Sequence, residues 1–349
     1  MWGIIAIFAE RNDNIMENKI SDNSKCGVIG YGSWATALVH VLEKNKKEVW
    51  WHIRNEEILE SMETEGRNVK YLSDLEFDTT LIHATRDLDE VIRNCEIILV
   101  AAPSAYLKNI LSEMTESLEG KFILSATKGI IPDQYITITE YFKEAYGISY
   151  SKLGVISGPS HAEEVSCNRL SYLTVACKDP ENAQLIGEMF STSTLKIRYS
   201  EDIYGIEYAG VLKNIYAIAA GLASGLGYGD NFRAVLISAS AKELTRFINE
   251  SYPFERDTTD PAYLGDLLVT SYSQFSRNRR LGQLIGKGCS VKSALNEMTM
   301  VAEGYFAAAC LKQVNEKYGI EVPIADMVYD VLYKKLSPRK KMRELTNIL

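Results

Sequence analysis

Near the start of the chain, two glycines and a small residue have the spacing of a G-x-G-x-x-G/A turn. The segment Gly30-Tyr31-Gly32-Ser33-Trp34-Ala35 follows a short apolar stretch and precedes residues with helical periodicity. In a G-x-G-x-x-G/A turn, the first glycine permits a tight turn, the second lets the backbone approach a pyrophosphate, and the third small residue allows helix–strand packing. Free N–H groups in the first helical turn complete a phosphate site. We therefore predict that Gly30 and Gly32 bind a dinucleotide, NAD(H) or NADP(H).

An arginine stands where such a turn is usually followed by an acid. About 20 residues beyond the glycines, an Asp or Glu commonly binds the ribose 2′-hydroxyl. Here the second apolar stretch ends Trp51-His52-Ile53-Arg54-Asn55, which contains no acid. Arg54 favours acceptance of a 2′-phosphate, and hence of NADP(H). An exposed arginine at the end of a strand is the simpler alternative.

A lysine, Lys213, lies in an otherwise apolar helical segment beside Leu212 and Ile215. Because an unpaired buried ammonium group is costly, this pattern favours a chemical role. A ketone that receives a hydride needs a proton donor at its oxygen, and Lys213 is a candidate. The ordinary lysine pKa of about 10.4 suits neutral pH poorly, but burial and a second cation, Lys128, would lower it. Taken alone, Lys128 before Gly129 would be an exposed turn residue.

Groups suited to orienting a lysine and binding a phosphate occur further along the chain. Asp266 is a candidate for orienting Lys213, although a helix cap would also explain it. Arg277 and Asn278 offer hydrogen-bond donors for a phosphate, and an arginine presents them as a planar fork. The run from Arg277 to Arg280 could equally form a solvated face, as charge runs usually do.

The elements that must position these residues change character near Ser200. Before Ser200, short apolar stretches typical of strands alternate with segments of helical periodicity. This alternation predicts βαβ units and a mostly parallel sheet. After Ser200, helical periodicity prevails. The predicted strands are 25–29, 48–53, 95–101, 122–126, 153–156, 172–177 and 195–197, and the predicted helices are 34–44, 56–65, 106–117, 136–146, 211–222, 232–249, 291–298, 303–318 and 324–334.

The pattern predicts an α/β protein of two domains after an N-terminal extension. The extension, residues 1–24, lacks the basic segment and cleavage site of a signal peptide. We expect it to be disordered or to reflect a mis-assigned start, with Met1 and Met16 as the alternatives. Residues 25–200 are predicted to form a Rossmann-like dinucleotide-binding domain, and residues 201–349 an all-helical substrate and catalytic domain.

Composition excludes several classes of protein. The 349 residues are 46% hydrophobic and 24% charged, as in ordinary globular proteins, and the absence of an apolar run of about 18 residues argues against membrane insertion. A net charge of −8 argues against nucleic acid as a partner. The six cysteines are dispersed and no histidine lies nearby at metal spacing. We therefore expect no metal site and buried, reduced thiols in a cytoplasmic protein.

The polar clusters follow one another in an order typical of one enzyme family. After the glycine-rich turn come Ser125-Ala126-Thr127-Lys128-Gly129, Ser157-Gly158-Pro159-Ser160-His161-Ala162, Leu212-Lys213-Asn214, Gly265-Asp266-Leu267, Ser276-Arg277-Asn278 and Val301-Ala302-Glu303-Gly304. From Gly30 to about Gly304 the sequence resembles the NAD(P)-dependent glycerol-3-phosphate dehydrogenases, most closely the bacterial type. The resemblance implies a Rossmann-like domain, a helical domain and a cleft between them. It also implies reversible reduction of dihydroxyacetone phosphate to sn-glycerol 3-phosphate for phospholipid synthesis.

The resemblance further implies roles for individual residues. Lys213 would be the catalytic acid/base, and Lys128 would reach both cofactor and substrate. The implied substrate-binding residues are Lys128, Gly158, Ser160, Lys213, Asp266, Ser276, Arg277 and Asn278. The implied cofactor neighbours are Ser33 and Trp34 at the phosphates, Arg54 on the adenosine ribose side, and Tyr71, Lys128, Ala162, Arg277, Val301 and Glu303. The sequence departs from the family pattern at Ser238-Ala239-Ser240, in place of Thr-Arg-Gly, and at Asp260-Pro261-Ala262-Tyr263, in place of a Gly- and Ala-rich run.

Two other functions stay open at this point. One is a dehydrogenase for another small hydroxy acid or sugar acid, which the phosphate-type donors Arg277 and Asn278 argue against. The other is a nucleotide-sensing binding protein without catalysis, which the presence of both Lys128 and Lys213 opposes. The sequence also leaves open the preference between NADH and NADPH, and whether the chain forms a homodimer.

Overall fold

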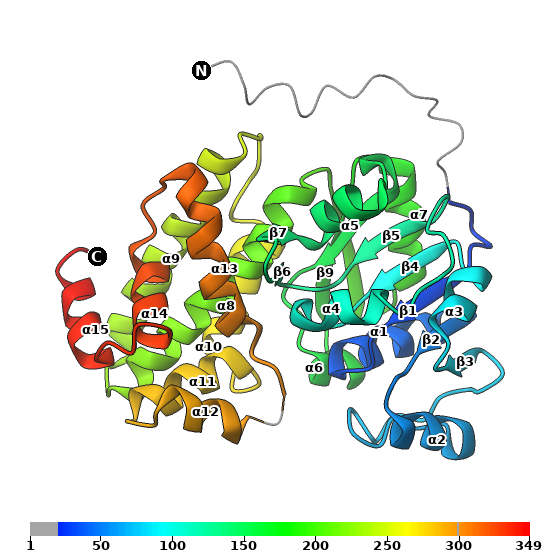
Figure 1. Cartoon of the computed structure of the whole chain (residues 1–349), viewed down its shortest axis with the longest axis horizontal. Helices are drawn as coiled ribbons and strands as arrows, with labels where there is room; N and C mark the ends of the chain where they lie inside the picture. Colours follow the sequence, from blue (N-terminus) through cyan, green and yellow to red (C-terminus); the bar gives the residue numbers. More distant parts are fainter. Residues whose placement is uncertain (1–19, 299) are drawn as a thin grey trace.

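The computed structural model describes residues 20–298 and 300–349. The predicted N-terminal extension therefore lies outside the described residues as far as residue 19. Figure 1 shows a sheet with its covering helices in one part of the molecule and a group of helices in the other. The last strand of the sheet ends at Ser200, and the described elements after it are all helical.

Within residues 20–298 and 300–349, eight strands form a single sheet in the order β10-β9-β8-β5-β4-β1-β2-β3. Every neighbouring pair is parallel except β8 and β9, which confirms the predicted mostly parallel sheet. The strands are β1 (Cys26–Ile29), β2 (Val49–His52), β3 (Ile82–Thr85), β4 (Ile97–Val100), β5 (Phe122–Ser125), β8 (Leu153–Ser157), β9 (Ser171–Cys177) and β10 (Leu195–Ser200).

Both faces of the sheet are covered by helices. Successive strand residues point to opposite faces, so Val28 and Leu99 enter one apolar core while Ile29 and Val100 enter the other. This two-sided burial explains why the central strands read as continuous apolar runs in the sequence. The covering helices are α1 (Ser33–Lys44), α2 (Glu56–Glu65), α3 (Leu88–Asn94), α4 (Ser104–Leu111), α5 (Ile138–Tyr146), α6 (Ala162–Ser166) and α7 (Pro180–Phe190).

Several predicted boundaries in this part of the chain were wrong. The helix predicted over 106–117 begins at Ser104 and ends at Leu111. Strand β3 was not predicted, because it lies at the sheet edge and only Ile82 of its four residues is buried. The two-residue strands β6 (Ile130–Ile131) and β7 (Ile136–Thr137), which pair with each other, were also not predicted. Such short segments carry no recognisable periodicity.

The helical part is built around α8 (Ile203–Gly225), which is buried from Ile203 to Ala223. Helix α11 (Arg277–Gly286) packs so closely on α8 that a Cβ atom at Gly282 would lie 2.1 Å from the Ile218 carbonyl oxygen. A polar side chain on α8 must therefore find its partners inside the protein. The surrounding elements are α9 (Asp230–Ser251), the π-helical turn η4 (Pro261–Gly265), α10 (Asp266–Tyr272), α11 (Arg277–Gly286), α12 (Val291–Glu297), α13 (Glu303–Tyr318), α14 (Pro323–Leu332) and α15 (Pro338–Thr346).

The cysteines are free, but not all of them are buried as expected. Cys26, Cys95, Cys177 and Cys310 are buried, whereas Cys167 is exposed and Cys289 is partly exposed. Cys167 is the residue that follows the short helix α6, and it is exposed to solvent there. Among the described residues, no group of three or more His, Cys, Asp or Glu side chains is arranged to hold a metal ion. None of the described helices is both long and apolar enough to cross a membrane.

Candidate active site

A cleft with a volume of about 190 Å³ lies between the carboxyl edge of the sheet and the helical part. Strand β1 has β2 on one side and β4 on the other, so the strand order reverses here. Ligands of doubly wound sheets bind at such a point. The cleft brings together these predicted site residues: Gly32, Ser33, Trp34, Lys128, Ser160, Ala162, Lys213, Ser276, Arg277, Asn278, Val301 and Glu303.

A second cavity, with a volume of about 910 Å³, continues from the first. The two share Gly32, Arg277 and Val301, so they form one elongated groove. Three more predicted residues, Gly30, Arg54 and Tyr71, lie in this second part. The glycine-rich turn is therefore in the middle of the groove, with the lysines towards one end and Arg54 towards the other.

Two lysines from distant parts of the sequence share one buried carboxylate. Lys128, which follows β5, donates to Asp266 Oδ2 at 2.9 Å, and Lys213 of α8 donates to Asp266 Oδ1. Asp266 begins α10, and only 1% of it is exposed. It lies beneath the two ammonium groups and not on the surface of the cleft. This position suits orientation of the lysines better than direct contact with a ligand.

The protonation of this cluster follows from its burial. Burial lowers the pKa of Lys213 to about 7, and Lys128 acts in the same direction while Asp266 opposes both. Burial alone would raise the pKa of Asp266, but the two ammonium groups outweigh it and hold that pKa below its ordinary value. Asp266 is therefore ionised at neutral pH. Lys213 can gain or lose a proton near neutrality, as a general acid/base must.

An amide chain fixes the elements that carry the lysines. Asn214 donates to the Lys128 carbonyl oxygen at 3.0 Å and accepts from Asn278 Nδ2 at 2.9 Å. Asn278 in turn accepts from the Gly304 N–H group at 2.9 Å. These bonds link the turn after β5 to α8, α11 and α13. Asn278, predicted to bind a phosphate, thus has its oxygen and one N–H group engaged inside the protein.

The turn after β8 orients Lys128 through its backbone. The Gly158 carbonyl oxygen accepts from Lys128 Nζ and from the Ser160 hydroxyl, both at 3.1 Å. Gly158 has φ +145°, and a Cβ atom there would lie 2.7 Å from the Tyr172 carbonyl oxygen, so a glycine is required. Gly158 therefore contributes a carbonyl group to Lys128 and lets the backbone pass close to Tyr172. Ser160 contributes a hydroxyl group that lines the cleft.

Arg277 is the exposed cation that lines both parts of the groove. It is the first residue of α11, whose cap is Ser276, and the Ser276 hydroxyl accepts from Arg279 N at 3.2 Å. Arg280, by contrast, faces away from the groove and pairs with Glu297 at 3.6 Å. Within this run, Arg277 therefore lines the groove, whereas Arg280 belongs to a solvated face.

The glycine-rich turn has the geometry that a pyrophosphate needs. Gly30 has φ +116°, and a Cβ atom there would lie 2.7 Å from Ala102 N. Gly32 precedes α1, which has no side-chain cap, and a Cβ atom at Gly32 would meet no atom within 4 Å. The helix N-terminus is thus open to an anion. Beside it, the buried atoms Trp34 Nε1 and His161 Nε2 have no hydrogen-bond partner among the described residues.

The far end of the groove holds two arginines, of which only Arg54 was predicted. Arg54 pairs with Glu113 at 3.1 Å and Tyr71 lies in the same cavity. Arg86, just beyond the end of β3, lines this cavity too and pairs with Glu56. Recognition of β3 from the sequence would have pointed to Arg86, because residues at the carboxyl ends of parallel strands share one edge of the sheet.

Glu303 joins the helical part to the sheet across the cleft. Its carboxylate accepts from the Ser104 N–H group at 3.1 Å and from the Ser104 hydroxyl at 2.7 Å, at the start of α4. Burial raises the pKa of Glu303, while Ser104 and Arg277 oppose that effect. Ser104 was not predicted, and neither was Thr270, whose hydroxyl donates to the Asp266 carbonyl oxygen at 2.6 Å. Thr270 follows Asp266 by one helical turn, which is the signal that would have found it.

A doubly wound sheet with a glycine-rich turn at the switch point, facing a buried Lys–Asp–Lys cluster, defines a dinucleotide-dependent oxidoreductase. The family profile for the N-terminus of NAD-dependent glycerol-3-phosphate dehydrogenase matches residues 25–183, and the profile for its C-terminus matches residues 202–343. The chain belongs to this family.

Individual relatives agree with that assignment. The chain is 34% identical to a glycerol-3-phosphate dehydrogenase [NAD(P)+] of Macrococcus caseolyticus, over 92% of this chain and 97% of that protein. It is 36% identical to one of Leptospira biflexa, with the same two coverages. Among solved structures, glycerol-3-phosphate dehydrogenase from Coxiella burnetii matches with a TM-score of 0.87 and 28% identity, covering 93% of this chain and 99% of that one.

Proposed function

We propose that this protein reversibly transfers a hydride from NAD(P)H to dihydroxyacetone phosphate, giving sn-glycerol 3-phosphate for glycerophospholipid synthesis. The observation that carries the proposal is the Lys128–Asp266–Lys213 cluster at the end of a groove that contains the glycine-rich turn. Relatives of similar length that carry the name glycerol-3-phosphate dehydrogenase [NAD(P)+] support the same activity.

The residues of the groove fit the proposed cofactor. The open N-terminus of α1, with Gly32 and Ser33, would hold the pyrophosphate. Arg54, Arg86 and Tyr71 would surround the adenosine end. When bound, the nicotinamide supplies the hydride. Trp34 and Val301 line the same cleft as Lys128 and Lys213, and with the cofactor bound they would help to keep water from the lysines.

Lys213 would supply the proton that the ketone oxygen needs. Negative charge develops on that oxygen as the hydride arrives, and an ammonium group stabilises it and then donates. Asp266 holds Lys213 in place, and Lys128 adds a second positive charge on the cleft surface. In the reverse direction, neutral Lys213 would accept the hydroxyl proton of glycerol 3-phosphate.

The pKa of Lys213 predicts opposite pH profiles for the two directions. Ketone reduction requires protonated Lys213, so kcat should be constant at acidic pH and fall as the pH rises through about 7. Alcohol oxidation requires the neutral amine, so its kcat should rise over the same interval. The measurement is kcat in both directions at saturating substrates. A reduction rate that increases with pH through this interval would contradict the assignment.

Arg54→Ala should weaken NADPH binding more than NADH binding. Arg54 lies at the end of the groove where a 2′-phosphate would fall, and its partial exposure limits the expected loss for NADPH to about fivefold. Binding titrations with both cofactors measure the difference. Arg67→Ala is the matched control, because Arg67 is also partly exposed and paired with a glutamate but lies outside the groove. Equal losses for NADPH and NADH would remove Arg54 from this role.

The proposed function is tested by following NADPH and NADH absorbance with dihydroxyacetone phosphate and with a panel of non-phosphorylated ketones. The expected result is rapid oxidation of cofactor with dihydroxyacetone phosphate only. Turnover with a keto acid instead would indicate a dehydrogenase of another hydroxy acid. Cofactor binding without turnover of any ketone would indicate a nucleotide-sensing protein.

Three further predictions belong to this proposal. We propose that residues 25–200 bind the cofactor and that residues 201–349 supply the proton donor, since β10 ends at Ser200 and α8 begins at Ile203. We propose a cytoplasmic location, which fractionation would test.

The formation of a homodimer stays a prediction, which sedimentation analysis would test.

A further inference from the structure

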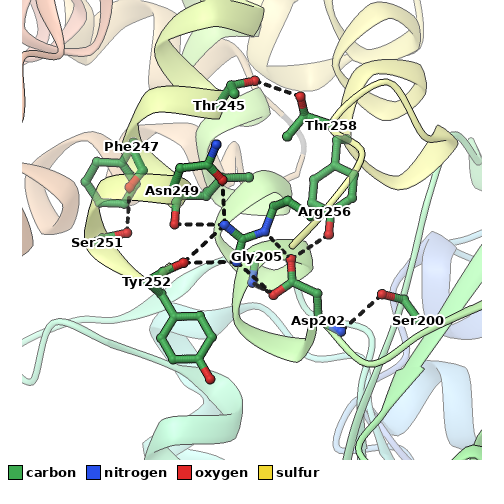
Figure 2. Close-up of polar contacts among 12 residues, drawn as sticks. Ser200, Asp202, Gly205, Thr245, Phe247, Asn249, Ser251, Tyr252, Arg256 and Thr258 are labelled. Atoms are coloured by element: carbon green, nitrogen blue, oxygen red, sulfur yellow. Dashed lines mark hydrogen bonds and ion pairs between the residues drawn. The ribbon is translucent and has the colours of Figure 1, made fainter. Parts of the chain in front are cut away.

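A buried ion cluster lies at the start of α8, outside the cleft. Asp202 caps this helix, accepting from the Gly205 N–H group at 3.0 Å, and is 2% exposed. Arg256 Nε donates to Asp202 Oδ2 at 2.6 Å and Arg256 Nη2 donates to Oδ1 at 3.1 Å, as Figure 2 shows. The Tyr263 hydroxyl donates to Asp202 Oδ2 at 2.6 Å. One carboxylate therefore binds a helix start, an arginine and a tyrosine.

The remaining hydrogen bonds of the Arg256 guanidinium group go to residues at the end of α9. Arg256 donates to the Ile248 and Tyr252 carbonyl oxygens at 3.1 Å and to Asn249 Oδ1 at 2.7 Å. Its side chain is 2% exposed. A buried ion pair with all these hydrogen bonds made is rigid, and loss of either charge would leave the other uncompensated. The cluster is therefore a fixed point to which the segment after α9 is attached.

The tyrosine connects this fixed point to the lysine cluster. Tyr263 belongs to the π-helical turn η4, which ends at Gly265 and leads directly into Asp266. Asp202 begins the helix that carries Lys213 about three turns further along. The Tyr263–Asp202 bond thus joins the element that presents Asp266 to the element that presents Lys213. Turns of this kind frequently occur at functional sites.

We propose that Tyr263 is a positioning residue, whose bond to Asp202, the ion-pair partner of Arg256, sets where Asp266 meets Lys128 and Lys213. A glycine- and alanine-rich run in place of Asp260-Pro261-Ala262-Tyr263 would have no hydroxyl group to make this bond. In the part of the chain that the structure describes, the other side-chain hydrogen bond at this turn is the ion pair between Arg198 and the preceding residue Asp260 at 3.2 Å, which is half exposed and contributes little. The buried Tyr263–Asp202 bond is therefore the stronger of these two polar attachments.

The proposal rests on the proposed function and is tested with Tyr263→Phe in the full chain. This substitution keeps the ring and leaves Asp202 paired with Arg256, so the protein should fold. Without the hydroxyl group, Asp266 should move by a fraction of an ångström to about 1 Å. Such a displacement of the group that orients Lys213 should lower kcat for dihydroxyacetone phosphate about tenfold or more. The KM for NADPH should stay unchanged, because Tyr263 lies outside both parts of the groove.

A second readout does not depend on turnover. Lys213 faces the charges of Asp266 and Lys128 and the imidazole of His161. If Asp266 moves away, Lys213 loses the group that favours its charged form, so its titration midpoint should shift down by about one pH unit. NMR titration of the labelled lysine side chains measures the midpoint in wild type and Tyr263→Phe. The same shift should appear as an earlier fall of kcat with rising pH.

Thr258→Val is the matched control. The Thr245 hydroxyl donates to Thr258 Oγ1 at 3.0 Å, which ties the same segment to α9 without touching Tyr263 or Asp202 (Figure 2). This variant should keep wild-type kcat and Lys213 titration. If Tyr263→Phe keeps both wild-type values, or if Thr258→Val changes them equally, the proposal is overturned. A wild-type protein without turnover of dihydroxyacetone phosphate would overturn the proposed function alone, because the NMR titration still tests Tyr263.

Discussion

Replacement of Lys213 by methionine is expected to lower kcat for dihydroxyacetone phosphate reduction by about 10²–10⁴-fold, the usual contribution of a general acid. Methionine is similar in length to lysine but cannot donate a proton. The substitution leaves Asp266 bonded to Lys128 at 2.9 Å, so no buried carboxylate loses its last partner. The variant should therefore fold and bind NADPH nearly as well as wild type, because the glycine-rich turn and Arg54 are untouched.

The measurement pairs steady-state kinetics with cofactor titration. Lys312→Met is the control, since Lys312 is also paired with an aspartate, Asp326, but is partly exposed and away from the cleft. It should retain full turnover. A folded Lys213→Met protein with near wild-type kcat would show that the proton comes from elsewhere, with Lys128 the first residue to examine.

Substitution of Arg277 by lysine is expected to lower kcat/KM for dihydroxyacetone phosphate by roughly ten- to hundredfold. Lysine keeps the charge but loses the planar fork that binds a phosphate with two parallel bonds. A hydrogen bond to a charged group contributes about 1.5–3 kcal/mol, which gives this range. The loss should appear mainly as a higher KM, because the phosphate is not the reacting group. Some rise in the KM for cofactor is also expected, since Arg277 lines both parts of the groove.

Two controls separate phosphate binding from a general disturbance. Unphosphorylated dihydroxyacetone has no phosphate, so its slow turnover should change much less in Arg277→Lys. Arg280→Lys changes the same residue type on the same helix, but Arg280 pairs with Glu297 outside the cleft. It should behave as wild type. Equal losses for the two ketones would exclude Arg277 as the group that binds the phosphate.

The sequence predicted much of this site because the chemistry required unusual residues. A lysine in an apolar helix and a lysine before a glycine stood out, and the structure brings both to Asp266. The same reasoning did not distinguish a surface ligand from a buried support. Asp266 and Asn278 were grouped with substrate contacts, which stays a prediction; the structure adds that Asp266 lies beneath the lysines and that Asn278 lines the cleft while bonded to Asn214 and Gly304. Burial of this kind depends on tertiary packing.

The roles that we propose for Arg86 and Tyr263 could not be predicted from the sequence. Arg86 follows an edge strand with one buried residue, and Tyr263 lies in a π-helical turn, so neither element has a periodicity to recognise. Ser104 begins a helix whose start was placed two residues late. Its bond to Glu303 joins residues distant in the sequence, and no local pattern encodes such a contact.

The most direct test of the central claim is the fate of the hydride itself. The protein is incubated with dihydroxyacetone phosphate and NADPH that carries deuterium at both C4 positions, and the product is analysed by NMR and mass spectrometry. The account predicts sn-glycerol 3-phosphate with one deuterium on C2, formed in step with the loss of reduced cofactor. Unchanged dihydroxyacetone phosphate, or glycerol 3-phosphate without deuterium at C2, would contradict it.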